Sequence, residues 1–269
     1  MANLPHTLPS LFVPHGSPVS ALRPGPSGEV LAQAAHTLPQ PRVIVIVSAH
    51  WDTAEPTVGF AERPATIHDF YGFPEPLYRL RYPATGCPEA AREVVEALRS
   101  GGLPVHIDSA RGLDHGAWIP LRTMFPEADI PVVPLSIQSH AGPRHAWRLG
   151  TALAPLAERG FLVIASGNLT HNLRDFRSGM HEAGSTDYVR RFTDWIAARL
   201  AEGDLEALLD YRRRAPDAVR AHPTDEHLLP LFVALGAAGP AARANRLHAG
   251  IDYGVLAMDA YAFTPEHAT

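Results

Sequence analysis

One stretch decides the fold of this chain: Val43-Ile44-Val45-Ile46-Val47-Ser48-Ala49-His50-Trp51. Its first five residues are β-branched, which is typical of a strand buried on both faces and therefore of a sheet covered by helices. The run leads directly to His50, so this imidazole is predicted at the carboxyl end of a central strand. In open α/β sheets that edge binds ligands, because loops from several strands meet there.

Two other apolar runs are also followed by histidines. Residues 8–13 lead into Pro14-His15-Gly16-Ser17, and residues 161–166 lead into a turn that is followed by His171. The glycine and prolines around His15 favour a tight, stiff loop that holds the imidazole in place. Three histidines just past three buried strands predict a functional site at one edge of the sheet.

The remaining pattern predicts a single α/β domain over residues 1–269, with a central mostly parallel or mixed sheet flanked by helices on both faces. No repeat, low-complexity tract or linker divides the chain. Pro134 predicts that the strand over 132–137 lies at an edge or contains a bulge. Helices are expected over residues 27–37, 88–100, about 116–124, 144–159 and 186–212, with a break at Gly203, and a last strand over 253–258.

Composition narrows the function. The net charge of −5 argues against nucleic acid as a partner, and no signal peptide or apolar run of membrane-spanning length is present, so we expect a cytoplasmic protein. The oligomeric state is left open. The lack of lysine excludes Schiff-base chemistry and P-loop nucleotide binding, and the single Cys87 excludes disulfides and cysteine-based metal sites. The 15 histidines instead suggest a bound metal.

A fourth histidine lies near the end of His222-Pro223-Thr224-Asp225-Glu226-His227. Because Pro230 is tolerated only in the first turn of a helix, we expect a helix to begin near residues 225–227. His227 then lies at a helix N-terminus, where the dipole disfavours imidazolium and keeps a lone pair free for a metal. His222 remains an alternative ligand, although it precedes a proline in a loop.

Assembled in order, these segments resemble the class III extradiol ring-cleavage dioxygenases, specifically the DOPA-type branch. The likeness covers nearly the whole chain and rests on the following blocks: Pro14-His15-Gly16-Ser17-Pro18, Val47-Ser48-Ala49-His50-Trp51, Ile67-His68-Asp69-Phe70, Leu113-Asp114-His115-Gly116, Ala165-Ser166-Gly167-Asn168, His171-Asn172-Leu173 and 222–227. The family fold is a single α/β domain, in agreement with the pattern above.

The resemblance implies that His15, His50 and His227 hold the metal, with His171 beside it as acid/base or extra ligand and His115 in the pocket. Better-known members use two histidines and a glutamate. Here the third ligand looks like histidine, because the adjacent Glu226 would point about 100° away on a helix. We expect Fe(II) to support turnover, and an all-histidine set also suits Zn(II).

The expected reaction is extradiol cleavage of a small catechol, DOPA-like or other, with O2. His171, and secondly His115, are the candidates for proton transfer, because imidazole titrates near neutral pH. The long, irregular segment over 51–83 predicts a lid or pocket wall, since loops of this length are usually functional. We expect it to supply the substrate-binding residues Trp51, His68, Phe70, Tyr71 and Phe73.

Three alternatives remain at this point. The same histidines suit a zinc hydrolase that activates water. A metal-binding protein without catalysis would have a closed four-ligand site and no substrate-sized pocket. A serine hydrolase centred on Ser166-Gly167-Asn168 has less support, because Gly-x-Ser-x-Gly is absent.

Overall fold

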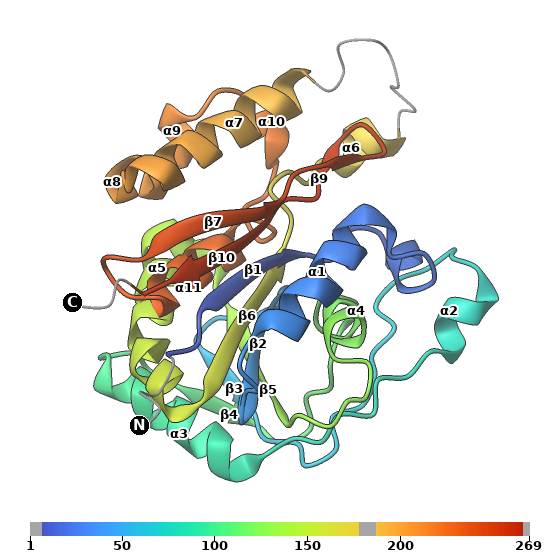
Figure 1. Cartoon of the computed structure of the whole chain (residues 1–269), viewed down its shortest axis with the longest axis vertical. Coiled ribbons are helices and arrows are strands. Elements are labelled where there is room, and N and C mark those ends of the chain that lie inside the picture. The colour runs from blue at the N-terminus through green and yellow to red at the C-terminus, as the bar shows by residue number, and fades with distance from the viewer. Residues whose placement is uncertain (1–6, 178–186, 266–269) are drawn as a thin grey trace.

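The computed structural model describes residues 7–177 and 187–265. Within these residues, eight strands form one mixed sheet in the order β4-β3-β5-β2-β6-β1-β10-β7 (Figure 1). The strands are β1 (Ser10–Pro14), β2 (Val43–Asp52), β3 (Thr57–Gly59), β4 (His106–Asp108), β5 (Val132–Ile137), β6 (Phe161–Gly167), β7 (Arg243–His248) and β10 (Ala260–Thr264); β8 (Ile251–Asp252) and β9 (Leu256–Ala257) pair separately.

The centre of the sheet is parallel and its flanks are not. Strands β5, β2, β6 and β1 run parallel to one another, whereas β10 and β7 add an antiparallel ribbon next to β1 and β3 pairs antiparallel with β5. The carboxyl ends of β1, β2 and β6 therefore meet at one edge. This confirms the predicted single-domain α/β fold with a mixed sheet.

The run in β2 explains why helices cover both faces. Val45 and Val47 belong to one buried cluster, and Ile44 and Ile46 to the cluster on the opposite face, because successive strand residues alternate. The first cluster includes residues of α3 (Pro88–Ser100), α5 (Gly142–Leu153), α7 (Asp187–Glu202) and α11 (Leu229–Ala237). The second includes residues of α1 (Gly25–Thr37) and α4 (His115–Met124).

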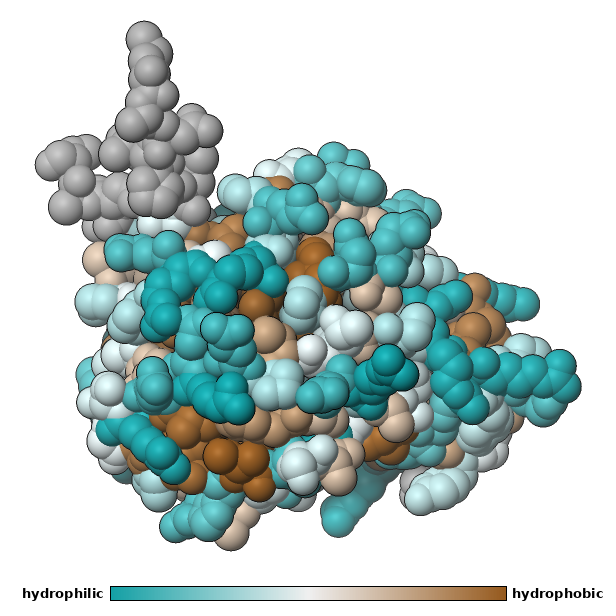
Figure 2. Space-filling view, turned by 90° about the horizontal axis from the view of Figure 1, so that it is seen from below, coloured by the Kyte–Doolittle hydropathy of each residue, from teal (hydrophilic) through white to brown (hydrophobic). Residues whose placement is uncertain are grey.

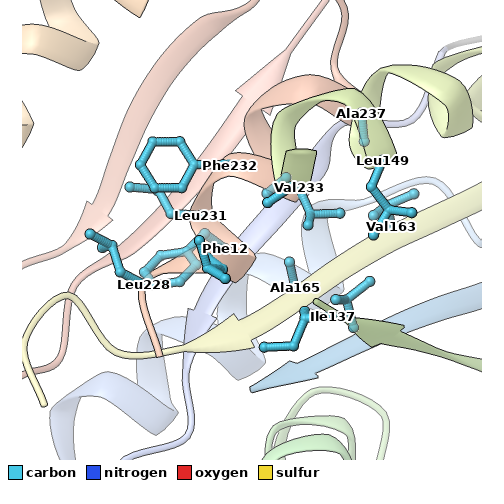
Figure 3. Close-up of a cluster of buried hydrophobic side chains, with 14 of the residues drawn as sticks. Phe12, Ile137, Leu149, Val163, Ala165, Leu228, Leu231, Phe232, Val233 and Ala237 are labelled. Carbon is cyan, nitrogen blue, oxygen red and sulfur yellow. The ribbon is translucent and has the colours of Figure 1, made fainter. Parts of the chain in front are cut away.

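Helix α11 is held tightly between α5 and the sheet (Figure 3). A Cβ added to Gly150 of α5 would lie 2.1 Å from the carbonyl oxygen of Val233, and one added to Gly236 would lie 2.2 Å from that of Trp147. Glycine at both positions allows the two helix backbones to approach closely. Phe232 and Val233 both belong to the buried apolar cluster that also contains Leu149 and Val163. This packing fixes the turn that precedes α11.

Three sequence predictions need correction. Strand β5 is not at an edge but between β3 and β2; of the two predicted alternatives, only the irregularity is seen, as a register shift in its pairing with β2 after Val47. Gly59 makes room for Pro134, since a Cβ there would lie 2.5 Å from Cγ of the proline. The helix expected over 144–159 leaves α geometry after Leu153, because Pro155 has no N–H to donate. The last long strand is β10 rather than 253–258, because Tyr253 turns the chain with a φ of 51°.

Shorter elements complete the structure: α2 (Glu75–Arg79), α6 (Leu173–Arg177), α8 (Leu205–Leu209), α9 (Tyr211–Arg214), α10 (Ala218–Ala221), and the 3-10 turns η1 (Pro18–Ala21), η2 (Ser139–Ala141) and η3 (Ala154–Arg159). The face drawn in Figure 2 is mostly hydrophilic, with apolar residues in a few separate areas. Among helices in the two described ranges, none has both the length and the apolar character needed to cross a membrane.

Candidate metal centre and substrate pocket

His15 follows β1 at the carboxyl edge of the sheet. The parallel register of β1 with β6 pairs Val13 with Ser166, which brings the serine beside the His15 ring. The ring is buried, and its Nδ1 lies 2.9 Å from Ser166 Oγ. With Nδ1 donating to this oxygen, Nε2 keeps the lone pair, and it lies 3.1 Å from Nε2 of His50.

His50 is fixed at the end of β2 by a connection to helix α4. The backbone N–H of His50 donates to Ser48 Oγ, and this hydroxyl donates to Asp114 Oδ1 over 2.6 Å. Asp114 also caps α4 by accepting from the N–H of Ala117. A Cβ at Gly116 would lie 2.4 Å from Ser48 Oγ, so only glycine allows the helix to start this close to the strand.

His227 lies in the turn just before α11, which begins at Leu229 and not at residues 225–227 as predicted. Its carbonyl oxygen accepts from the N–H of Asn168 over 2.9 Å, and a Cβ on Gly167 would lie 2.1 Å from that oxygen. Nδ1 of His227 lies 3.0 Å from Glu226 Oε1. Its Nε2 is buried without a hydrogen-bond partner.

The three rings face one another. Candidate ligand atoms of His15, His50 and His227 all lie within 4.8 Å of each other. Burial, with neighbouring histidines as the next cause, holds the pKa of His15 and of His227 well below the ordinary value, and burial lowers that of His50 to about 3. Three neutral imidazoles, one of which, His227, has a buried nitrogen without a partner, are a donor set that fits a divalent transition metal.

His171 lies directly beside this cluster. Its ring stacks on that of His227, with centroids 3.4 Å apart and planes 8° from parallel. Its backbone N–H donates to the carbonyl of Ala221, which holds the segment after β6 in place. Burial lowers the pKa of His171 to about 4, so the ring is neutral near pH 7 and can accept a proton.

His115 begins α4 and lies against Asp69, a residue with no predicted role. One carboxylate oxygen of Asp69 accepts from the His115 backbone N–H over 2.9 Å, and the other lies 3.0 Å from its Nδ1 and 3.6 Å from Nδ1 of His50. Burial raises the pKa of Asp69, but its interactions with the side chain and backbone of His115, and with the nearby His50, outweigh burial and bring the value to about 2. Its place in the block Ile67-His68-Asp69-Phe70 was the available signal.

These histidines line one cavity of about 430 Å³. Its lining also includes Phe70, Tyr71 and Phe73, three of the five residues expected to bind substrate. Two further lining residues, Phe176 and Leu256, belong to none of the sequence blocks and were not predicted. The complete lining is His15, Gly16, Ser17, Pro18, His50, Asp69, Phe70, Tyr71, Phe73, His115, His171, Leu173, Phe176, His227 and Leu256.

Several sequence candidates lie outside this lining. Trp51 is buried beside the Arg111 guanidinium, and His68 directs Nε2 at the Leu80 carbonyl over 3.1 Å. His222, the alternative ligand, is fully buried with Nε2 2.8 Å from the Leu169 carbonyl. Ser166 is also fully buried, so its hydroxyl supports His15 and is not exposed as a nucleophile.

The chain is similar to several known proteins. Residues 10–264 match the family described as the catalytic LigB subunit of aromatic ring-opening dioxygenase. The chain is 40% identical to a Beta vulgaris protein named 4,5-DOPA dioxygenase extradiol, covering 95% of this chain and 96% of that protein. It is also 40% identical to an Escherichia coli protein of the same name, over 86% and 85% of the two chains.

The fold is also similar to a solved structure. A crystal structure of an uncharacterized Escherichia coli K12 protein superposes with a TM-score of 0.76 at 31% identity, covering 95% of this chain and 99% of that one.

Proposed function

This chain belongs to the family of catalytic LigB subunits of aromatic ring-opening dioxygenases, and we propose that its reaction takes place at His15, His50 and His227. The family and the named relatives make the protein a metal-dependent extradiol dioxygenase that acts on an aromatic substrate with O2. A zinc hydrolase at the same histidines is therefore not favoured. We also propose that residues 1–269 form one catalytic domain, which the family match over 10–264 supports.

The proposed metal site rests on one observation, the orientation of the Nε2 atoms of His15, His50 and His227. Ser166 and Glu226 lie at the Nδ1 atoms of His15 and His227, and Asp69 lies near that of His50. Each ring thus has an oxygen on its outer side and Nε2 on the inner side, the arrangement that orients metal-binding histidines. We propose Fe(II) as the metal of turnover and Zn(II) as an alternative occupant.

Bound there, Fe(II) would bring the two catechol oxygens and O2 together and pass charge between them. The chain itself provides the proton transfers. His171 is neutral and borders the cavity, so it is suited to remove a catechol proton and to return it later as an acid. Asp69 lies 3.0 Å from Nδ1 of His115, which favours the tautomer with its proton on Nδ1 and leaves Nε2 of that ring as a second proton-transfer atom.

The pocket suits a flat ring that carries a substituent. Phe70 lies edge-on to the His115 ring at 5.7 Å and to the Phe73 ring at 5.4 Å, and these rings provide aromatic walls. A volume of about 430 Å³ lies within the range of small-molecule sites. A small catechol is the proposed substrate, with DOPA as one candidate because relatives carry its name.

The direct test is O2 uptake by protein reconstituted anaerobically with Fe(II) and mixed with catechol. The expected result is one O2 consumed for each catechol, with both atoms of labelled O2 in the ring-opened product. Ester hydrolysis by the zinc form, together with no O2 uptake by the iron form, would instead support the hydrolase.

A further inference from the structure

Exposed apolar side chains gather at the mouth of the cavity. Tyr71 is 88% exposed, Leu173 44% and Phe176 38%, yet all three line the same cavity as the histidines. Tyr253, 46% exposed, lies edge-on to Phe176 at 5.2 Å. We call these four residues the apolar rim. In the part of the chain that the structure describes, they make up four of the seven exposed large hydrophobic residues.

The position of these apolar residues around a cavity indicates that they bind a ligand. Single exposed apolar residues are normal on protein surfaces, but a group of them around a cavity marks a binding groove. The rim comes from three separate parts of the chain: Tyr71 from the long loop after β3, Leu173 and Phe176 from α6, and Tyr253 from the turn after β8. Their convergence on one mouth therefore does not follow from a single apolar run of sequence.

The cavity connects the rim to the proposed metal site. Phe73 and the buried Leu256 also line it, so that apolar contacts extend from the histidines outward. A catechol whose two oxygens face the histidines would present the opposite side of its ring to this apolar wall. A cavity of about 430 Å³ also has more room than a single ring requires.

The charges of the side chains that line the cavity further restrict which substituent the catechol can carry. Apart from histidines, Asp69 is the one charged side chain among the described residues that line the cavity, and no arginine is among them. A carboxylate on the substrate would thus lose water without gaining a cationic partner in this lining, and it would face the negative Asp69.

We propose that the rim selects catechols with an uncharged apolar substituent, an alkyl, alkenyl or aryl group long enough to reach Tyr71 and Phe176. This inference rests on the proposed function of the site. It differs from the name of the relatives, because the DOPA side chain carries both an ammonium and a carboxylate.

A substrate series tests the rim. With Fe(II)-reconstituted enzyme, kcat/KM is measured for catechol, 4-methylcatechol, 4-propylcatechol, 3-(3,4-dihydroxyphenyl)propionate, dopamine and DOPA. Because burying one methylene is worth about 0.8 kcal/mol, or about fourfold, and the rim is half exposed, we expect a two- to fourfold rise for each added carbon. The proposal is overturned if kcat/KM does not rise along the alkyl series, or if a charged substrate has a higher kcat/KM than 4-propylcatechol.

Anaerobic binding titrations with the same compounds test the proposed function and the rim proposal separately. If catechol binds but O2 is not consumed, the proposed function fails, while the order of dissociation constants still tests the rim. If catechol is cleaved and the dissociation constants do not fall along the alkyl series, the rim proposal alone fails.

Substitutions in the rim test whether these residues cause the dependence of kcat/KM on alkyl length. Tyr71→Ser and Phe176→Ser should each flatten the dependence on alkyl length. Ile107→Ser is the matched control, because Ile107 is 53% exposed on β4 and lies outside the cavity; it should keep the full dependence. Retention of the full dependence in both rim variants, or its loss in the control, would contradict the assignment.

Discussion

The rings of His171 and His227 lie face to face, 3.4 Å apart and nearly parallel. A metal ion lies close to the plane of each imidazole that binds it. Two parallel planes separated by 3.4 Å have no common point near the site, so the two rings cannot bind one ion in this arrangement. If His227 is a ligand, as we propose, the role proposed for His171 is proton transfer and not metal binding.

His171→Ala therefore tests the role of the stacked ring. We expect kcat to fall by about 10²- to 10⁴-fold, the usual contribution of a general acid or base, while iron content stays near that of the wild type. Metal analysis and O2 uptake on the same sample give both values. Loss of iron in parallel with activity would make His171 a ligand instead.

Asp69→Asn tests the orientation of His115. The amide keeps the size of the carboxylate, but with its NH2 directed at Nδ1 it would move the imidazole proton to Nε2. We expect kcat to fall by roughly 10- to 100-fold with a smaller change in KM, as for other residues that orient a functional histidine. Asp129→Asn, at an exposed position outside the cavity, is the control and should leave both constants unchanged.

Ser166→Ala removes the oxygen that orients His15. We expect metal affinity to fall by roughly 10- to 100-fold, measured by competition with a chelator. Ser136→Ala removes another fully buried serine hydroxyl, on β5, whose partners are the side chains of Thr53 and Gln138 and the backbone N–H of Thr57. Metal affinity should be unchanged in this control; an equal loss in both variants would indicate general destabilisation of the sheet.

The metal-free protein should lose stability in acid. Burial, with its hydrogen bond to the Leu169 carbonyl opposing, lowers the pKa of His222 to about 4, so the folded state binds fewer protons than the unfolded state below pH 6.5. The stability is complete above pH 6.5 and is lost as pH falls to about 4; for His222 alone this amounts to about 3 kcal/mol.

Urea unfolding of the metal-free form between pH 7 and pH 4 measures this loss. His222→Gln should lower stability at pH 7 but make the dependence on pH shallower, because a buried titrating group is gone. An unchanged slope in that variant would assign the acid sensitivity to other groups.

The central strand and the site edge were predictable because both depend on local pattern. The β-branched run of β2 determines burial on both faces, and parallel strands bring His15 and His50 to the same edge. Trp51 could also have been excluded, since neighbouring strand residues point to opposite faces and His50 faces the cavity.

Other features depend on contacts that no local pattern reveals. Asp69 lies in a long irregular loop, and its role follows only from the approach of α4 to that loop. Phe176 and Leu256 come from segments far apart in the chain, and they share the cavity only through the tertiary arrangement. The interior place of β5 likewise depends on Gly59 of a neighbouring strand making room for Pro134.

The most direct measurement is an anaerobic titration of Fe(II) into the wild-type protein and into a variant with His15, His50 and His227 all changed to alanine. We predict one tightly bound Fe(II) for each wild-type chain, and a folded variant with no tight site and no O2 uptake with catechol. Equal stoichiometry and affinity in the two proteins would show that the metal binds elsewhere.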